Sequence, residues 1–121
     1  MTEDSTYTLY RKGMELLEDG SFREATVPLA EAAKRAPEKT SVREALGRAY
    51  FRSNKFAQAA TEFEAVVEFA PVNDYAHFCL GRALTMTGER KRARHHLALA
   101  SNLQPQRHDY RLYRDRARGA A

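Results

Sequence analysis

The chain has 121 residues, the length of one domain, and contains no apolar run near the roughly 20 residues that a membrane-spanning helix needs. Its net charge of +4 is unevenly placed, because residues 1–73 carry 10 basic and 12 acidic side chains whereas residues 74–121 carry 10 basic and 4 acidic ones. A single cysteine, Cys79, excludes an intrachain disulfide.

The N-terminus and the amino-acid usage predict a cytoplasmic protein of bacterial origin. The opening residues, MTEDSTYT, lack the basic and then apolar layout of a signal peptide. A lone cysteine fits a reducing compartment. The 15 arginines against 5 lysines, together with 20 alanines, are typical of a GC-rich bacterial genome and say nothing about function.

The first predicted elements are a pair of helices over about 5–18 and 21–35. Ser21 and Glu24 have the spacing of a capping box, in which the serine caps the backbone and the glutamate reaches back. Pro28 lies inside the second helix of the pair. Its missing N–H predicts a bend at this point but not a break.

A second pair of helices is predicted over about 41–52 and 55–69. Larger apolar side chains recur here at steps of three and four residues, so each helix has one apolar stripe. Ser41 and Glu44 fit another capping box. Aromatic side chains on such stripes usually belong to the core, which predicts core positions for Tyr50, Phe56 and Phe63.

The remaining residues predict a third pair of helices, over about 74–86 and 90–103, and a last helix over 108–118. Asn73, followed by Asp74, is expected to cap the first of these helices. The last helix keeps a helical apolar stripe through Tyr110, Tyr113 and Ala117.

Catalytic and metal-binding motifs are absent from this sequence, which has no Gly-rich phosphate loop, nucleophile elbow or zinc-protease motif. His95 and His96 are adjacent on a predicted helix, so they point about 100° apart and do not converge on one metal ion. One of them is expected to be half-buried and the other solvated. His77 is interpreted as a packing residue.

One pattern recurs along the chain with a period of 34 residues. Glycine stands at positions 13, 47 and 81, and proline at positions 37, 71 and 105. The window of residues 40–73 contains, in order, Leu46-Gly47, Tyr50, Phe56, Ala59, Phe63 and Pro71. This spacing resembles the tetratricopeptide repeat, a helix–turn–helix unit of the same length.

The resemblance implies an all-α fold, a right-handed superhelical solenoid of three tetratricopeptide repeats over 6–39, 40–73 and 74–107. Residues 108–118 lack the Leu-Gly pair and look like the solvating helix that caps such arrays. The whole chain, 1–121, is then a single domain.

The resemblance further implies a non-enzymatic adaptor that binds a peptide or partner protein in a concave groove formed by the first helix of each repeat. Neither a cofactor nor a metal ion is expected. Aromatic residues, methionine and arginine are the types enriched at protein–protein interfaces. The groove residues that the resemblance gives are Tyr7, Tyr10, Arg11, Met14, Leu17, Glu18, Ser41, Glu44, Ala45, Arg48, Phe51, Arg52, Tyr75, Phe78, Cys79, Arg82, Thr85 and Met86.

The chemistry of these residues predicts a ligand with acidic and apolar side chains. Arg48 and Arg82 occupy the same slot in neighbouring repeats. Co-chaperone relatives use Lys, Asn and Arg to clamp a partner's C-terminal carboxylate, but that clamp is absent, since its slots hold Tyr10, Met14, Ala45, Tyr75 and Cys79. Alternatively, some groove aromatics pack under the cap helix or between repeats. A purely self-associating scaffold is a third alternative.

Cys79 falls on the predicted groove side. Arg82 follows one turn later, where its charge would lower the pKa of the thiol and make it reactive. The other interpretation is a small residue that merely lines the groove.

A basic edge offers an alternative function, the binding of nucleic acid or another polyanion. Arg90, Lys91, Arg92 and Arg94 crowd the start of one predicted helix, where exposed N–H groups also favour anions. If the last helix packs antiparallel to that helix, Arg114 and Arg118 are expected to join the cluster, together with Arg116. The other interpretation is a solvated charged face.

Overall fold

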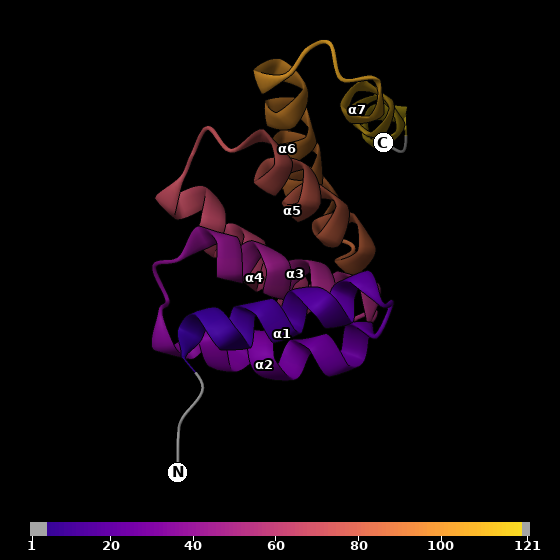
Figure 1. The fold of residues 1–121 in the computed structure, drawn as a ribbon. Helices are drawn as coiled ribbons and strands as arrows, with labels where there is room; N and C mark the ends of the chain where they lie inside the picture. The colour runs from indigo at the N-terminus through magenta and orange to yellow at the C-terminus, as the bar shows by residue number, and fades with distance from the viewer. Residues whose placement is uncertain (1–4, 120–121) are drawn as a thin grey trace.

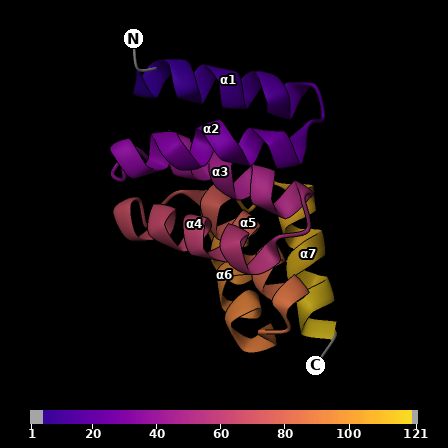
Figure 2. The same ribbon diagram turned by 90° about the horizontal axis from the view of Figure 1, so that it is seen from below.

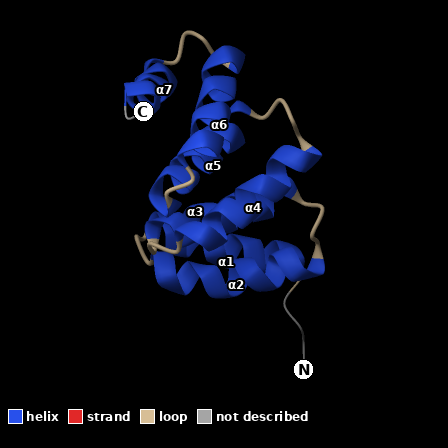
Figure 3. Ribbon diagram, turned by 180° about the vertical axis from the view of Figure 1, so that it is seen from behind, coloured by secondary structure: helices blue, strands red, loops and turns tan. Residues whose placement is uncertain are grey.

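The computed structural model describes residues 5–119, and this part of the chain forms seven helices and no strand (Figure 1, Figure 3). In chain order they are α1 (Thr6–Glu18), α2 (Phe22–Arg35), α3 (Thr40–Arg52), α4 (Phe56–Phe69), α5 (Asp74–Thr87), α6 (Arg90–Leu103) and α7 (His108–Gly119). The seven predicted helices are therefore confirmed, with bounds within about two residues of those predicted.

The helices stack in chain order as three pairs followed by a single helix (Figure 1, Figure 2). Each of α1, α3 and α5 packs against the helix that follows it, and α7 packs against α6. On one face α1 also contacts α3, and α3 contacts α5. This arrangement confirms the predicted all-α solenoid of three helix pairs with a terminal cap helix.

Three equivalent glycines allow the two helices of each pair to approach closely. A Cβ atom on Gly47 would lie 2.8 Å from the Phe63 ring, and one on Gly81 would lie 2.6 Å from Leu97 Cγ. At Gly13 the same atom would collide with the Leu29 side chain. In each pair one large residue of the second helix therefore occupies the place of the missing side chain, which explains why glycine recurs at the repeat period.

The helix starts agree with the prediction only in part. Asn73 caps α5 as predicted, since its Oδ1 accepts from the Ala76 N–H at 3.0 Å. The Ser21 capping box is wrong, because at ψ 65° its backbone is not extended and its side chain makes no capping bond. The Ser41 box is also wrong, because α3 begins one residue earlier, at Thr40. As predicted, α2 continues through Pro28 without a break.

The cap helix α7 closes the core of the third pair. Tyr110 is fully buried, and its hydroxyl donates to Asp74 Oδ2 at 2.8 Å. Its ring centroid lies 4.7 Å from that of Phe78 on α5. Earlier in the stack Phe63 is buried as predicted, whereas Tyr50 and Phe56 are half-buried.

Candidate functional site

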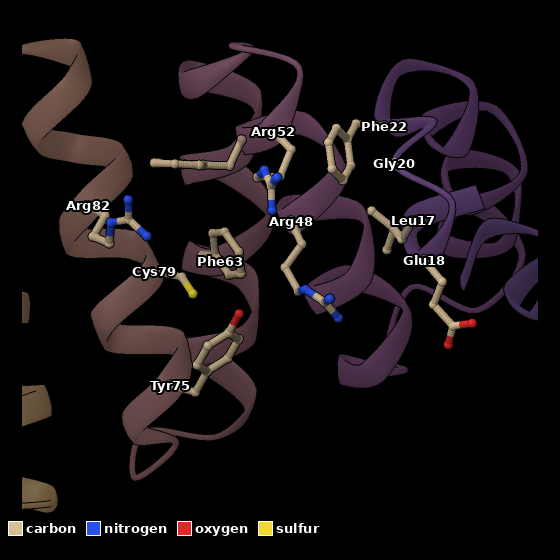
Figure 4. A pocket seen from close by; sticks show the side chains of 11 residues that line it. Leu17, Glu18, Gly20, Phe22, Arg48, Arg52, Phe63, Tyr75, Cys79 and Arg82 are labelled. Atoms are coloured by element: carbon tan, nitrogen blue, oxygen red, sulfur yellow. The ribbon is translucent and has the colours of Figure 1, made fainter. Parts of the chain in front are cut away.

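A cavity of about 430 Å³ opens on the face that α1, α3 and α5 share (Figure 4). The end of α1, the turn after it and the start of α2 form one wall, and α3, α5 and one residue of α4, Phe63, form the rest. The lining residues are Leu17, Glu18, Gly20, Phe22, Arg48, Phe51, Arg52, Phe63, Tyr75, Cys79 and Arg82. We call this cavity the groove.

Aromatic rings hold two of the three groove arginines in place. The Arg52 guanidinium carbon lies 4.2 Å from the ring centroid of Phe22, and that of Arg82 lies 4.9 Å from the ring centroid of Phe51. Phe51 is itself in edge contact with Phe56 at a centroid distance of 5.1 Å. These cation–π contacts leave the N–H groups at the edges of each guanidinium available to a ligand.

The groove carries an excess of positive charge. Arg48, Arg52 and Arg82 face a single acidic lining residue, Glu18. Within residues 5–119, none of the three guanidinium groups forms an ion pair or a hydrogen bond. By contrast, Arg43 outside the groove lies 3.0 Å from Glu62 Oε1. An anionic ligand would therefore meet three arginines that are not ion-paired within residues 5–119.

A second hollow of about 390 Å³ continues the groove toward the ends of α3 and α5. It shares Phe51, Arg52 and Arg82 with the groove and adds Asn54, Phe56 and Met86. Met86 is 55% exposed, so apolar surface lies open beside two arginines. The combined site suits a ligand that presents acidic and apolar side chains together.

The structure brings part of the predicted groove set together. Eight of the predicted residues line the cavity: Leu17, Glu18, Arg48, Phe51, Arg52, Tyr75, Cys79 and Arg82. The other predicted residues of α1 do not. Tyr10 and Met14 pack against the core of the first pair, and Tyr7 is 68% exposed beside Arg11. Glu44 accepts a hydrogen bond from Asn73 Nδ2 at 3.3 Å and so joins α3 to the start of α5.

The prediction that Phe78 presents its ring to a ligand is wrong. Phe78 is only 7% exposed, and the Tyr110 and Tyr113 rings of α7 lie 4.7 and 5.2 Å from it. Its slot in the repeat does face the concave side, but the cap helix covers that slot. The alternative that some groove aromatics pack under the cap helix is correct for this residue.

Phe22 is a groove residue that the sequence reasoning missed. It begins α2, whereas the prediction considered only the first helix of each repeat. The available signal was the turn at Gly20, which returns the chain to the groove end of α1. An aromatic directly after that turn is placed beside the concave face.

Of the two interpretations of Cys79, the small lining residue is correct and the reactive thiol is wrong. Burial raises the pKa of Cys79 to about 12, an effect larger than the opposing influence of Arg82 and Arg48. Burial also raises the pKa of the neighbouring Tyr75. Neither group is thus a nucleophile near neutral pH, and Cys79 serves as a small lining residue.

The predicted basic edge divides into separate parts. Arg90 and Lys91 are exposed. Neither of them forms an ion pair with any described residue, and Arg94 forms none either. Arg92, however, contacts Glu64 at 2.7 Å and Glu89 at 3.3 Å. The remaining edge at the start of α6 therefore consists of three cations.

Arg114 does not join this edge, so the prediction is wrong for this residue. Arg114 donates to Ser101 Oγ at 3.1 Å, near the opposite end of α6 from Arg90. At about 1.5 Å per residue, Ser101 lies roughly 16 Å along the helix from Arg90. Arg118 lies 3.9 Å from Asp115 of its own helix.

A histidine pair joins α5 to α6 away from the groove. His77 Nε2 lies 2.7 Å from the Pro71 carbonyl oxygen, and its Nδ1 lies 3.0 Å from His96 Nδ1. A carbonyl only accepts, so His77 donates through Nε2 and accepts through Nδ1 from the His96 N–H. His77 is thus a packing residue, His96 is half-buried and His95 is exposed, all as predicted.

This pair is expected to make the third helix pair acid-sensitive. Burial, together with His77, His95 and Arg92, lowers the pKa of His96 to about 4 from 6.5. The unfolded chain therefore takes up this proton first, and the free energy of unfolding is expected to fall as the pH drops from 6.5 toward 4. Urea unfolding across that range checks this. The free energy of unfolding should depend more steeply on pH in the wild type than in His96→Gln. His108→Gln, at an exposed histidine on α7, is the control and should retain the wild-type dependence.

In the described part of the chain, no helix combines the length and the apolar character needed to cross a membrane. Among the same residues, no group of three or more His, Cys, Asp or Glu side chains is placed to hold a metal ion.

Comparisons with known proteins relate both the sequence and the fold to one family. The family model described as tetratricopeptide repeat matches residues 16–79, more than half of the chain. A comparison with curated proteins gave no match.

Several solved structures have a similar fold. One is the first TPR of Spaghetti (RPAP3) bound to the HSP90 peptide SRMEEVD, with a TM-score of 0.89 and 20% identity, over 95% of this chain and 91% of that chain. A second is MamA from Desulfovibrio magneticus RS-1, residue 41 to the end, with a TM-score of 0.91 and 21% identity, over 96% of this chain and 66% of that chain. A third is the Arabidopsis OM64 TPR domain, with a TM-score of 0.89 and 19% identity, over 96% of both chains.

Proposed function

Since the chain belongs to the tetratricopeptide repeat family, whose domains are generally protein–protein interaction modules and typically not catalysts, we propose that it is an adaptor. It binds a segment of a partner protein in the groove. The repeats of this adaptor are residues 6–39, 40–73 and 74–107, with 108–118 as the cap. The single cysteine supports a cytoplasmic setting, and the bias toward arginine and alanine supports a bacterial one.

One observation carries this proposal: three arginines that form no ion pair and no hydrogen bond within residues 5–119 line a cavity that also has aromatic walls. Unpaired guanidinium groups favour carboxylates, which they bind through paired N–H groups. The rings of Phe22 and Phe51 and the open surface at Met86 favour apolar side chains. The partner segment therefore carries Asp or Glu beside an apolar residue.

The likeness to a peptide-bound TPR domain supports the same site class but not the same contacts. The similar RPAP3 domain is bound to an acidic peptide, SRMEEVD. In the present chain the slots of the carboxylate clamp hold other residue types, including Tyr75 and Cys79. Recognition therefore depends on Arg48, Arg52 and Arg82, and a free C-terminus in the partner is not required.

Selection of a displayed peptide library on the wild-type protein is expected to enrich segments with acidic residues next to an apolar one. For a selected peptide, Arg48→Ala should weaken binding about tenfold or more, since a hydrogen bond to a charged group contributes about 1.5–3 kcal/mol. Isothermal titration measures the affinity. Circular dichroism should show unchanged helicity, because Arg48 is exposed.

Arg90→Ala is the matched control, an exposed arginine outside the groove whose loss should leave the affinity unchanged. The opposite result, full binding by Arg48→Ala and weak binding by Arg90→Ala, would reject the groove in favour of the basic edge. Salt gives a second discriminator, since binding of a polyanion such as RNA falls steeply with salt.

A further inference from the structure

Arg82 lies between the groove and the cap helix. It projects from α5, which stands between α3 and α7 in the stack (Figure 1, Figure 2). Its guanidinium carbon lies 4.9 Å from the ring centroid of Phe51 on α3 and 4.9 Å from that of Tyr113 on α7. The buried Phe78 ring is a third neighbour, at 5.8 Å.

Although three rings surround it, the Arg82 guanidinium makes no hydrogen bond and no ion pair within residues 5–119. Cation–π contacts attract the guanidinium to the rings without using its five N–H donors. Figure 4 shows the side chain directed from α5 toward α3, at the wall of the groove. The group is thus held in place while its donors stay available.

The ordering of this side chain has a consequence for affinity. A free arginine loses rotamer freedom when it binds an anion, and this loss of entropy weakens binding. Rings that already hold the side chain reduce this loss before the ligand arrives. Tyr113 supplies one of these rings, although it does not line the groove itself.

We propose that Tyr113 of the cap helix is a positioning residue for ligand binding, which holds Arg82 in the orientation that receives an Asp or Glu side chain of the partner segment. The inference rests on the proposed function of the groove. It gives α7 a role in recognition beyond covering the third repeat. The guanidinium carbon of Arg116, on the same helix, lies 5.4 Å from the centroid of the Tyr113 ring.

The test uses the full chain and the probe peptide Ac-Asp-Glu-Phe-Glu-Asp-NH2. In nuclear magnetic resonance spectra the Arg48, Arg52 and Arg82 Nε–Hε signals should shift on titration with this peptide. Tyr113→Leu should weaken binding about fivefold, whereas Tyr113→Phe, which keeps the ring, should bind like wild type. Leu112→Ala, an exposed neighbour on α7, is the matched control and should have no effect.

A double-mutant cycle separates positioning from cap stability. In an Arg82→Ala background, Tyr113→Leu should cause no further loss of affinity, because the group that it positions is gone. Pentafluorophenylalanine at position 113 keeps the ring shape but reverses its quadrupole, so it should weaken binding like leucine while the cap stays packed.

Two outcomes overturn the inference in different ways. If the Arg48 signal shifts and the Arg82 signal does not, or if all Tyr113 variants bind like wild type, the positioning role is wrong and the groove function stands. If the peptide shifts none of the three arginine signals, both the inference and its premise fail.

Discussion

Tyr110→Ala is expected to lower the free energy of unfolding by about 3–5 kcal/mol, the usual cost of removing a fully buried aromatic side chain. The ring is completely shielded from solvent, packs on Phe78 and ties α7 to α5 through its bond to Asp74. The alanine variant leaves a cavity over Phe78 and Leu97. A domain of this size has a total free energy of unfolding of only about 5–15 kcal/mol, so the substitution removes a large share of it.

Urea unfolding followed by circular dichroism measures the effect, since the chain has no tryptophan to report by fluorescence. Leu112→Ala is the control, because that residue is exposed and its change should stay within about 0.5 kcal/mol. Tyr110→Phe removes only the hydroxyl group and should lower the free energy of unfolding by about 1 kcal/mol. An alanine variant as stable as wild type would show that α7 is not a cap.

Gly47→Leu is the second change with a large expected effect. A Cβ at this position meets three ring carbons of Phe63 at 2.8, 2.9 and 3.1 Å, and Phe63 is only 1% exposed, so the ring is packed among core residues that must shift with it. Overpacking of this kind costs about 1–3 kcal/mol, and occasionally more. α3 and α4 are then forced apart at the middle of the stack.

The sign of this effect makes it a sharp test. Helix propensity alone favours leucine over glycine by roughly 0.8 kcal/mol, so a helix free of neighbours would gain stability. Gly119→Leu is the matched control, since nothing lies within 4 Å of a Cβ there. We expect the control to be neutral or slightly stabilising in the same urea experiment. A neutral Gly47→Leu would mean that the two helices do not meet at Gly47.

The periodicity of the sequence was sufficient to predict the stack. A period of 34 residues places glycine at the same point of each helix pair, and the structure shows a large side chain of the second helix at each of these points. The same period places Arg48 and Arg82 in one slot, and both line the groove. Such predictions hold because a repeat fixes how each side chain is oriented on its own helix and toward its nearest neighbours.

The helix starts were less predictable. Ser21 and Ser41 had the residue types of a capping box, yet neither side chain caps a helix. The turn before α2 fixes the Ser21 backbone at a ψ of 65°, which does not direct its oxygen at the helix N–H groups. Sequence type therefore indicated the region of each helix start, whereas local backbone geometry decided the hydrogen bond.

The sequence by itself determined the helices, the repeat and the positions of the groove arginines, whereas only the tertiary structure decided what covers each of them. Phe78 has a groove slot by its period but is buried, because α7, which has no counterpart in the repeat, lies over it. Cys79 lies one turn from a cation, yet burial governs its pKa. Arg114 is held at the far end of α6 from Arg90. Solvent access depends on elements distant in the chain, which helical spacing does not encode.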